Sequence, residues 1–237
     1  MMAGMGAENL ALVRGMDDTR AALRRWSADP WPTLGGWAAK AFAIACGLLV
    51  AVYAVARTSI PDFTPVVVPG VTRPATVSDL GFVLLRNATV LALHAFACVA
   101  GFIAGSSIPL EAAQRRGAWK AIHDWAGTLA IWFVVLATGF SLVTQALALG
   151  EGTVNVAAQL GMPPGLLLSI LSIHALPELT ALFLPLAAWL MASRRGEWRD
   201  LLAATFVTVA VAVPTLIVTA VVETYLTPLI IRAAIGA

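Results

Sequence analysis

The chain has 237 residues, of which 59% are hydrophobic and 12% are charged, and its mean hydropathy is +0.85. Soluble domains are about 45–50% apolar and about 25% charged, so the composition excludes a disordered chain and argues strongly against a soluble enzyme. The net charge of +2 is too small to indicate a protein that binds nucleic acid. The chain is therefore expected to be an integral membrane protein that lies in a lipid bilayer.

Residues 1–36 form an N-terminal segment that precedes the first long apolar run. The acidic pair Asp17 and Asp18 can cap a short helix that continues through Leu23 and Trp26. One face of this helix would carry arginines and the other Leu and Trp. This pattern predicts an amphipathic helix on the inner membrane surface, and the alternative is a solvated tail.

Five apolar stretches are long enough to cross a bilayer, because a helical span needs about 20 residues. They predict an all-α, polytopic transmembrane bundle within one domain, residues 37–232. The fourth and fifth stretches contain Pro177 and Pro214, where we expect the helices to break. The predicted spans are residues 37–56, 82–108, 125–149, 166–191 and 201–231.

The basic residues predict the orientation of the bundle. Eleven of the 15 Lys and Arg residues lie in or beside the N-terminal segment, the second-to-third connection and the fourth-to-fifth connection. Positive charges accumulate on the cytoplasmic side of a membrane, so the N-terminus is expected in the cytoplasm. Five spans then place the C-terminus outside.

The first external connection, residues 57–79, is rich in proline, which opposes helix and favours extended backbone. Its prolines are Pro61, Pro65, Pro69 and Pro74. This connection is the candidate surface for an external partner, and the alternative is an ordinary loop.

A few polar side chains lie inside the predicted spans, where each ionisable group costs about 2.5–3.5 kcal/mol to insert. His174 and Glu178 are four residues apart and share a helix face. Near the end of the fifth span, Glu223 is followed by Tyr225 and Thr227. These five residues form the predicted intramembrane polar cluster.

Two interpretations of this cluster remain open. It can be a site for a proton, an ion, a lipid headgroup or a partner helix, or it can be a hydrogen-bonded latch between spans. Asn87, beside Arg86 at the entry of the second span, and His94 within it are secondary candidates.

Small residues in the second span favour close helix packing. Gly101 and Gly105 form a GxxxG pattern with Ala97 in phase. This face makes a homo-oligomer plausible, with a dimer as the first expectation.

Motif searches give no enzymatic signature. A metalloprotease HExxH, the closing glycine of a nucleophile elbow, zinc spacing and a phosphate-binding glycine loop are all missing from the sequence. We therefore expect no enzyme, no metal site and no cofactor. A remote alternative is a haem-binding redox protein that would draw axial ligands from His94, His123 and His174.

The last two spans carry two motifs that resemble a known family. His174-Ala-Leu-Pro-Glu178-Leu-Thr-Ala181 resembles the PHGxxElpA signature of the stage II sporulation protein M family. Glu223-Thr-Tyr-Leu-Thr227-Pro228 resembles the closing AxxEaxxTP segment of that family, and Asn87 matches its Asn at the same place. The likeness is best over residues 165–230.

The resemblance implies a multi-pass protein of a prokaryotic plasma membrane without enzymatic chemistry. In spore formers, the namesake protein scaffolds a peptidoglycan-degrading complex. The favoured hypothesis is therefore a membrane scaffold that binds a membrane or cell-envelope protein. The alternative is a transporter or channel for a proton, ion or small solute that uses His174, Glu178 and Glu223.

Overall fold

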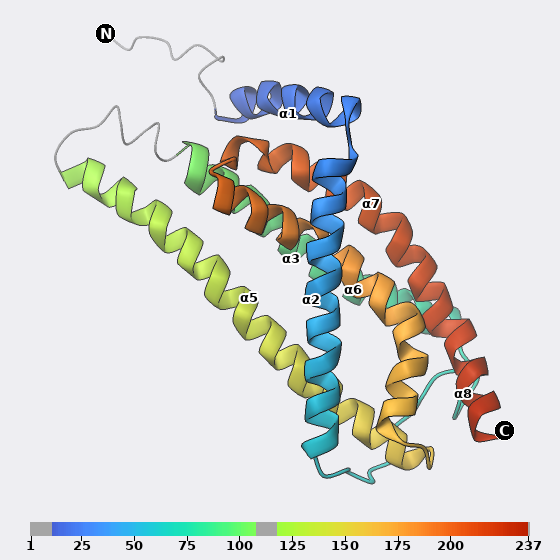
Figure 1. The fold of residues 1–237 in the computed structure, drawn as a ribbon. Helices are drawn as coiled ribbons and strands as arrows, with labels where there is room; N and C mark the ends of the chain where they lie inside the picture. Colours follow the sequence, from blue (N-terminus) through green and yellow to red (C-terminus); the bar gives the residue numbers. More distant parts are fainter. Residues whose placement is uncertain (1–10, 108–117, 237) are drawn as a thin grey trace. The chain divides into compact units, whose positions relative to one another are not determined.

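The computed structural model describes residues 11–107 and 118–236, and this part of the chain is almost wholly helical (Figure 1). Within it, the one β-type contact is an isolated bridge between Pro69 and Arg73. The elements are α1 (Ala11–Ala28), α2 (Trp31–Thr58), α3 (Val77–Phe102), the π-helix η2 (Ile103–Ser107), α5 (Ala118–Gln159), α6 (Pro164–Arg195), the 3-10 helix η3 (Trp198–Asp200), α7 (Leu201–Val221), the π-helix η4 (Val222–Leu226) and α8 (Thr227–Ile235).

Five of the helical segments are long and apolar enough to cross a membrane, which confirms the predicted all-α bundle. A helix is present in the predicted N-terminal segment as α1, but it begins at Ala11, so Asp17 and Asp18 lie inside it and the prediction that they cap it is wrong. Each segment includes most of one predicted apolar run. The candidate spans are Trp31–Thr58, Val77–Gly105, Val134–Gln159, Pro164–Arg195 and Trp198–Ile235.

The prolines do not interrupt the helices where breaks were expected. α6 continues as helix through Pro177, and α7 continues through Pro214, so the prediction of breaks at these residues is wrong. A proline removes one backbone hydrogen bond, but a full break would expose further backbone groups, which is costly in lipid. The departures from α-helical geometry are instead the π-helical segments η2 and η4.

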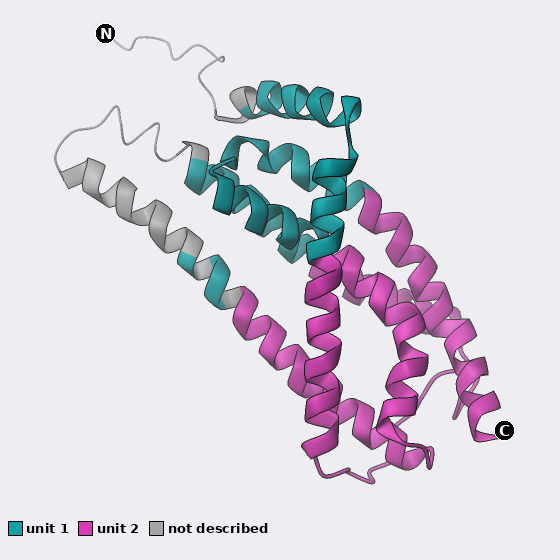
Figure 2. Ribbon diagram, viewed as in Figure 1, with its two compact units in different colours: residues 1–40, 91–137, 184–210 teal, residues 41–90, 138–183, 211–237 magenta. Residues whose placement is uncertain are grey.

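The chain forms two compact units, each assembled from three separate stretches (Figure 2). Unit 1 comprises residues 1–40, 91–137 and 184–210. Unit 2 comprises residues 41–90, 138–183 and 211–237, and it contains the connection between α2 and α3.

The core of unit 2 includes a cluster at the turn between α5 and α6. Gly161 makes this turn with a φ of +65°, a conformation that glycine adopts without strain. The buried members of the cluster are Ala157, Met162, Leu167, Ile170 and Ile231. The end of α5, the start of α6 and α8 are thereby packed together.

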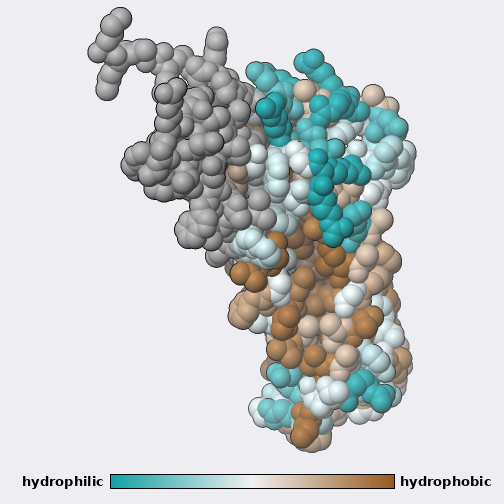
Figure 3. Space-filling view, turned by 60° about the vertical axis from the view of Figure 1, so that its left-hand side comes forward, coloured by the Kyte–Doolittle hydropathy of each residue, from teal (hydrophilic) through white to brown (hydrophobic). Residues whose placement is uncertain are grey.

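Large hydrophobic side chains cover much of the face drawn in Figure 3 and are exposed on the outer sides of the helices. A soluble protein rarely exposes so many large apolar side chains. Lipid is the medium that would cover it. Examples, all at least 60% exposed, are Val50, Phe82, Leu85, Leu93, Phe96, Leu136, Phe140, Phe206 and Val218.

The glycines of the GxxxG pattern lie against tryptophans of the same unit. In unit 1, a Cβ built on Gly101 would lie 2.5 Å from the indole nitrogen of Trp189, and one built on Gly105 would overlap the ring of Trp198. Ala97 is partly buried. Both glycines therefore serve to admit an indole ring, which only a residue without a side chain allows.

Candidate functional site

Four elements of unit 2 bring polar side chains together within the candidate spans. Arg86 and Asn87 come from α3, His174 and Glu178 from α6, Glu223 and Thr224 from η4, and Thr227 from α8. His174 and Glu178 project on one face of α6 because they are one helical turn apart. We call Arg86, Asn87, His174, Glu178, Glu223, Thr224 and Thr227 the polar cluster.

Arg86 joins the two carboxylates of the polar cluster. Its Nη2 lies 3.4 Å from Oε1 of Glu178 and 3.2 Å from Oε2 of Glu223. The Glu178 side chain is 8% exposed and the Glu223 side chain 24% exposed, so both carboxylates are largely removed from solvent. One guanidinium thus ties α3 to α6 and to η4. If both carboxylates are ionised, the three side chains of Arg86, Glu178 and Glu223 together carry one excess negative charge.

A second contact joins α6 to α8. Nδ1 of His174 lies 2.9 Å from the hydroxyl oxygen of Thr227, and both residues are buried. Either group can act as donor, depending on the tautomer of the imidazole. The contact satisfies one ring nitrogen inside the bundle, which a buried histidine requires.

Some buried polar atoms of the cluster have no hydrogen-bond partner in the described part of the chain. They are Nδ2 of Asn87, Oε2 of Glu178 and Oγ1 of Thr224. An unsatisfied buried group costs about 1–3 kcal/mol. The cluster therefore combines ion pairs and hydrogen bonds with three unpaired polar atoms: an amide nitrogen, a carboxylate oxygen and a hydroxyl oxygen.

The π-helix η4 carries Glu223 into the cluster and turns Tyr225 away from it. Tyr225 is 39% exposed, whereas Thr224 and Thr227 are buried. A π-turn holds one residue more than an α-turn and so changes which side chains face inward, and such segments are frequent at functional sites.

The structure places the other predicted site residues as follows. Asn87 is 2% exposed and belongs to the cluster. His94 is buried in unit 1, where it has an interaction of its own. Among the side chains that the structure describes, no group of three His, Cys, Asp or Glu residues could hold a metal ion. The side chain of His123, which the haem alternative needs, lies outside the described residues.

Sequence reasoning missed Arg86, which it treated as a connecting charge at the entry of a span. The helix begins at Val77, so Arg86 lies more than two turns inside α3. The signal that could have found it is the presence of buried carboxylates without a cation, because a buried charge needs a partner.

The connection between α2 and α3 is held to α5 by two side-chain amides. The Gln159 amide donates to the Val66 carbonyl at 2.9 Å and accepts from its N–H at 2.8 Å. One turn earlier, Asn155 Oδ1 accepts from the N–H of Asp62 at 2.9 Å. These bonds satisfy backbone groups at Asp62 and Val66 and hold the segment against α5.

This fixed segment exposes apolar side chains. Ile60 is 91% exposed, Phe63 is 75% exposed and Val67 is 63% exposed. We call these three residues the loop face. An ordered segment that holds apolar side chains outward is typical of a binding surface.

Comparison of the chain with family models, curated proteins and solved structures finds no match. The class of protein therefore rests on the fold. Its five long apolar helices are those of an integral, multi-pass membrane protein.

Proposed function

We propose that this chain is a membrane scaffold that recruits a membrane or cell-envelope protein through the loop face. The observation that carries the proposal is the fixed segment with its exposed Ile60, Phe63 and Val67. Gln159 holds this segment in place, so the entropy of ordering it is lost when the protein folds. A partner that binds the ordered segment therefore loses less entropy on binding. The likeness of residues 165–230 to the stage II sporulation protein M family supports the same role.

In this proposal the polar cluster is the latch that holds the scaffold together. Arg86 ties α3, α6 and η4 together, and the His174–Thr227 contact ties α6 to α8. The polar cluster includes several residues of the motifs that resemble that family, among them His174, Glu178 and Thr227. The latch keeps α6 and α8 in fixed positions within unit 2.

Photo-crosslinking in intact cells tests the recruitment. A photoactivatable phenylalanine analogue at Phe63 or Val67 is expected to capture a single protein reproducibly. The same analogue at Val77, which is 77% exposed but lies in the first turn of α3, is the matched control. Capture of lipid alone from the loop face, or equal protein capture from Val77, would refute the recruitment.

A second candidate function is the transport of a proton, a small cation or a small solute through the polar cluster. The unpaired Oε2 of Glu178 and the excess negative charge of Arg86, Glu178 and Glu223 together favour it. Proteoliposomes with a pH-sensitive dye inside test it, with a sodium- or potassium-sensitive dye in parallel. Flux in the wild type that is lost in a folded Glu178→Gln variant would establish transport. Absence of flux in both proteins would leave the latch as the role of the cluster.

A further inference from the structure

Unit 1 contains a cavity of about 340 Å³ at one end of its helices. The N-terminal helix α1 and the first turns of α2 form one wall, and the end of α6 with η3 and the start of α7 forms the other. The lining residues used below are Arg25, Trp26, Trp37, Arg195, Glu197 and Asp200. Nothing in the proposed scaffold function uses this cavity.

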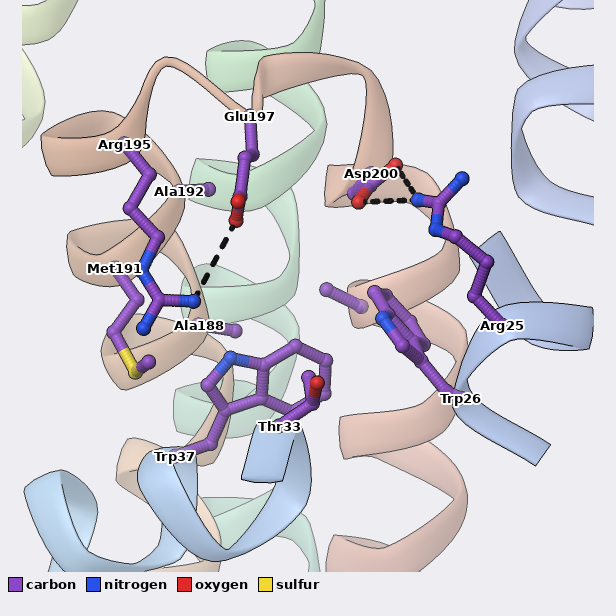
Figure 4. A pocket seen from close by; sticks show the side chains of 11 residues that line it. Arg25, Trp26, Thr33, Trp37, Ala188, Met191, Ala192, Arg195, Glu197 and Asp200 are labelled. Carbon is purple, nitrogen blue, oxygen red and sulfur yellow. Dashed lines mark hydrogen bonds and ion pairs between the residues drawn. The ribbon is translucent and has the colours of Figure 1, made fainter. Parts of the chain in front are cut away.

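The upper side of the cavity in Figure 4 carries charges of both signs. Arg25 makes a two-pronged pair with Asp200, with Nη2 at 2.8 and 2.7 Å from the two carboxylate oxygens. Arg195 and Glu197 are held far more loosely, since their closest atoms are 3.9 Å apart and both side chains are more than half exposed. The second pair is therefore free to exchange its partner for a ligand, because exposed ion pairs are weak.

The opposite side of the cavity is aromatic and apolar. The rings of Trp26 and Trp37 meet edge to face at 5.0 Å, and both line the cavity (Figure 4). Ala188, Met191 and Ala204 also line the cavity and add to its apolar lining. A ligand would thus meet charges at one end and hydrocarbon at the other.

The cavity lies beside the ends of three candidate spans, where lipid headgroups are expected. One candidate span begins at Trp31, a second ends at Arg195 and a third begins at Trp198, and these termini border the cavity. Tryptophans gather at this level of a membrane because their rings are apolar and their N–H groups are polar. The ligand best placed to enter is therefore a membrane lipid.

We propose that this cavity binds the phosphoethanolamine headgroup of a zwitterionic phospholipid, with the phosphate at Arg195 and the ammonium at Glu197. Two arginines and two carboxylates line the cavity, so its charges balance. A headgroup with only a negative charge at Arg195 would leave the Glu197 carboxylate without a cation, whereas Asp200 stays paired with Arg25. A primary ammonium donates three hydrogen bonds, which a carboxylate can accept, whereas a quaternary choline donates none. This difference selects ethanolamine over choline.

Native mass spectrometry of the full-length protein tests the proposal. The protein is released gently from detergent in the presence of equimolar phosphatidylethanolamine, phosphatidylcholine and phosphatidylglycerol. We expect phosphatidylethanolamine adducts to exceed each of the others at least threefold. Equal adduct levels for the three lipids would overturn the proposal.

Neighbouring arginines supply a matched pair of variants. Arg195→Gln and Glu197→Gln are expected to remove the preference, whereas Arg194→Gln, at an exposed arginine outside the lining, is expected to keep it. Loss of the preference in Arg194→Gln as well would show a general charge effect and would refute the site. Circular dichroism and thermal unfolding establish that each variant is folded.

Two further measurements fix the source and the place of the ligand, and they need no variant. Soluble glycerophosphoethanolamine in large excess is expected to leave the lipid adducts intact, because the apolar side of the cavity also holds the chains; displacement would assign the site to the free headgroup compound. A phosphatidylethanolamine that carries a photoactivatable group in its acyl chain, and so keeps its ammonium free, is expected to modify peptides that contain Trp26, Trp37 or Met191. Labelling confined to other peptides would overturn the assignment even if a variant fails to fold.

Discussion

Arg86 shows what one long side chain can do inside a bundle. Its guanidinium reaches carboxylates on α6 and η4, and its Nε donates to Oδ1 of Asn87 at 3.4 Å. The Arg86 side chain is 45% exposed, so part of it faces lipid, water or another molecule. The stem can lie along the apolar surface while the charged group stays with its partners.

Loss of this arginine should destabilise the protein, because two carboxylates would remain close together without a cation. Breaking a buried pair costs about 3–5 kcal/mol, and we expect about 1–3 kcal/mol for Arg86→Met because Arg86 is half exposed. Thermal unfolding in detergent measures the loss. Arg57→Met, at an exposed arginine in the last turn of α2, is the control and should unfold like the wild type.

A double variant separates charge from packing. Glu178→Gln in the Arg86→Met background removes one of the unpaired carboxylates, so it should recover part of the lost stability. An equally unstable double variant would contradict the electrostatic explanation.

Asp62 makes the fixed segment sensitive to acid. The backbone N–H and the hydroxyl of Thr64 donate to its carboxylate, and these bonds hold the pKa of Asp62 below its ordinary value of 3.8. A lowered folded pKa means that the stabilisation is present above pH 3.8 and is lost as the pH falls through the folded value. The turn at Asp62–Thr64 should therefore open only in strong acid.

Hydrogen exchange of the peptide that contains Thr64 measures this opening. Protection relative to the Asp62→Asn variant should be constant near neutral pH and should fall in acid, because the amide of the variant does not titrate. A ratio that stays constant down to about pH 2 would contradict the role of the carboxylate.

At the scale of elements, the connection between α2 and α3 is anchored to α8 by close packing at Gly70. This glycine has a φ of +77°, and a Cβ there would lie 2.6 Å from Cβ of Pro228. Gly161 has a φ of +65° but has open space around it. Both glycines therefore have a left-handed backbone conformation, but only Gly70 packs against another side chain, that of Pro228.

Substitution by alanine uses this difference. Gly161→Ala should lose about 1–2 kcal/mol from the left-handed backbone alone. Gly70→Ala should lose more, because the connection must also move away from Pro228. Thermal unfolding of the two variants measures both losses. A loss in Gly70→Ala no greater than that in Gly161→Ala would show that the contact with Pro228 does not hold the connection.

At the scale of the whole molecule, the basic residues predict an orientation that labelling can test. The cysteines Cys46 and Cys98 are first replaced by alanine, and single cysteines are then introduced at Val67 or Arg24, both of which are exposed. A membrane-impermeant maleimide should label Val67→Cys in intact cells and Arg24→Cys only after permeabilisation. The reverse pattern would invert the orientation, and the loop face would then lie in the cytoplasm.

The number and approximate limits of the spans follow from the sequence, because the thickness of the hydrocarbon layer demands runs of about 20 apolar residues. The pairing of His174 with Glu178 on one face also follows, since helical periodicity is a local property. The sequence also predicted that Glu223 and Thr227 lie near this pair, because polar side chains inside a membrane span need polar partners.

Only the tertiary structure decided which of these residues meet. Arg86 is 92 residues from Glu178 and 137 residues from Glu223, so no local pattern could assign it to both. A large separation in sequence also made it impossible to predict that Trp189 and Trp198 pack on Gly101 and Gly105, or that Gln159 bonds to Val66. The sequence by itself determined the helices, because both the hydrogen bonds of a helix and the hydrophobicity of a span depend on residues that are close together in the sequence. The structure alone determined the cluster, because side chains from separate helices meet only when those helices pack.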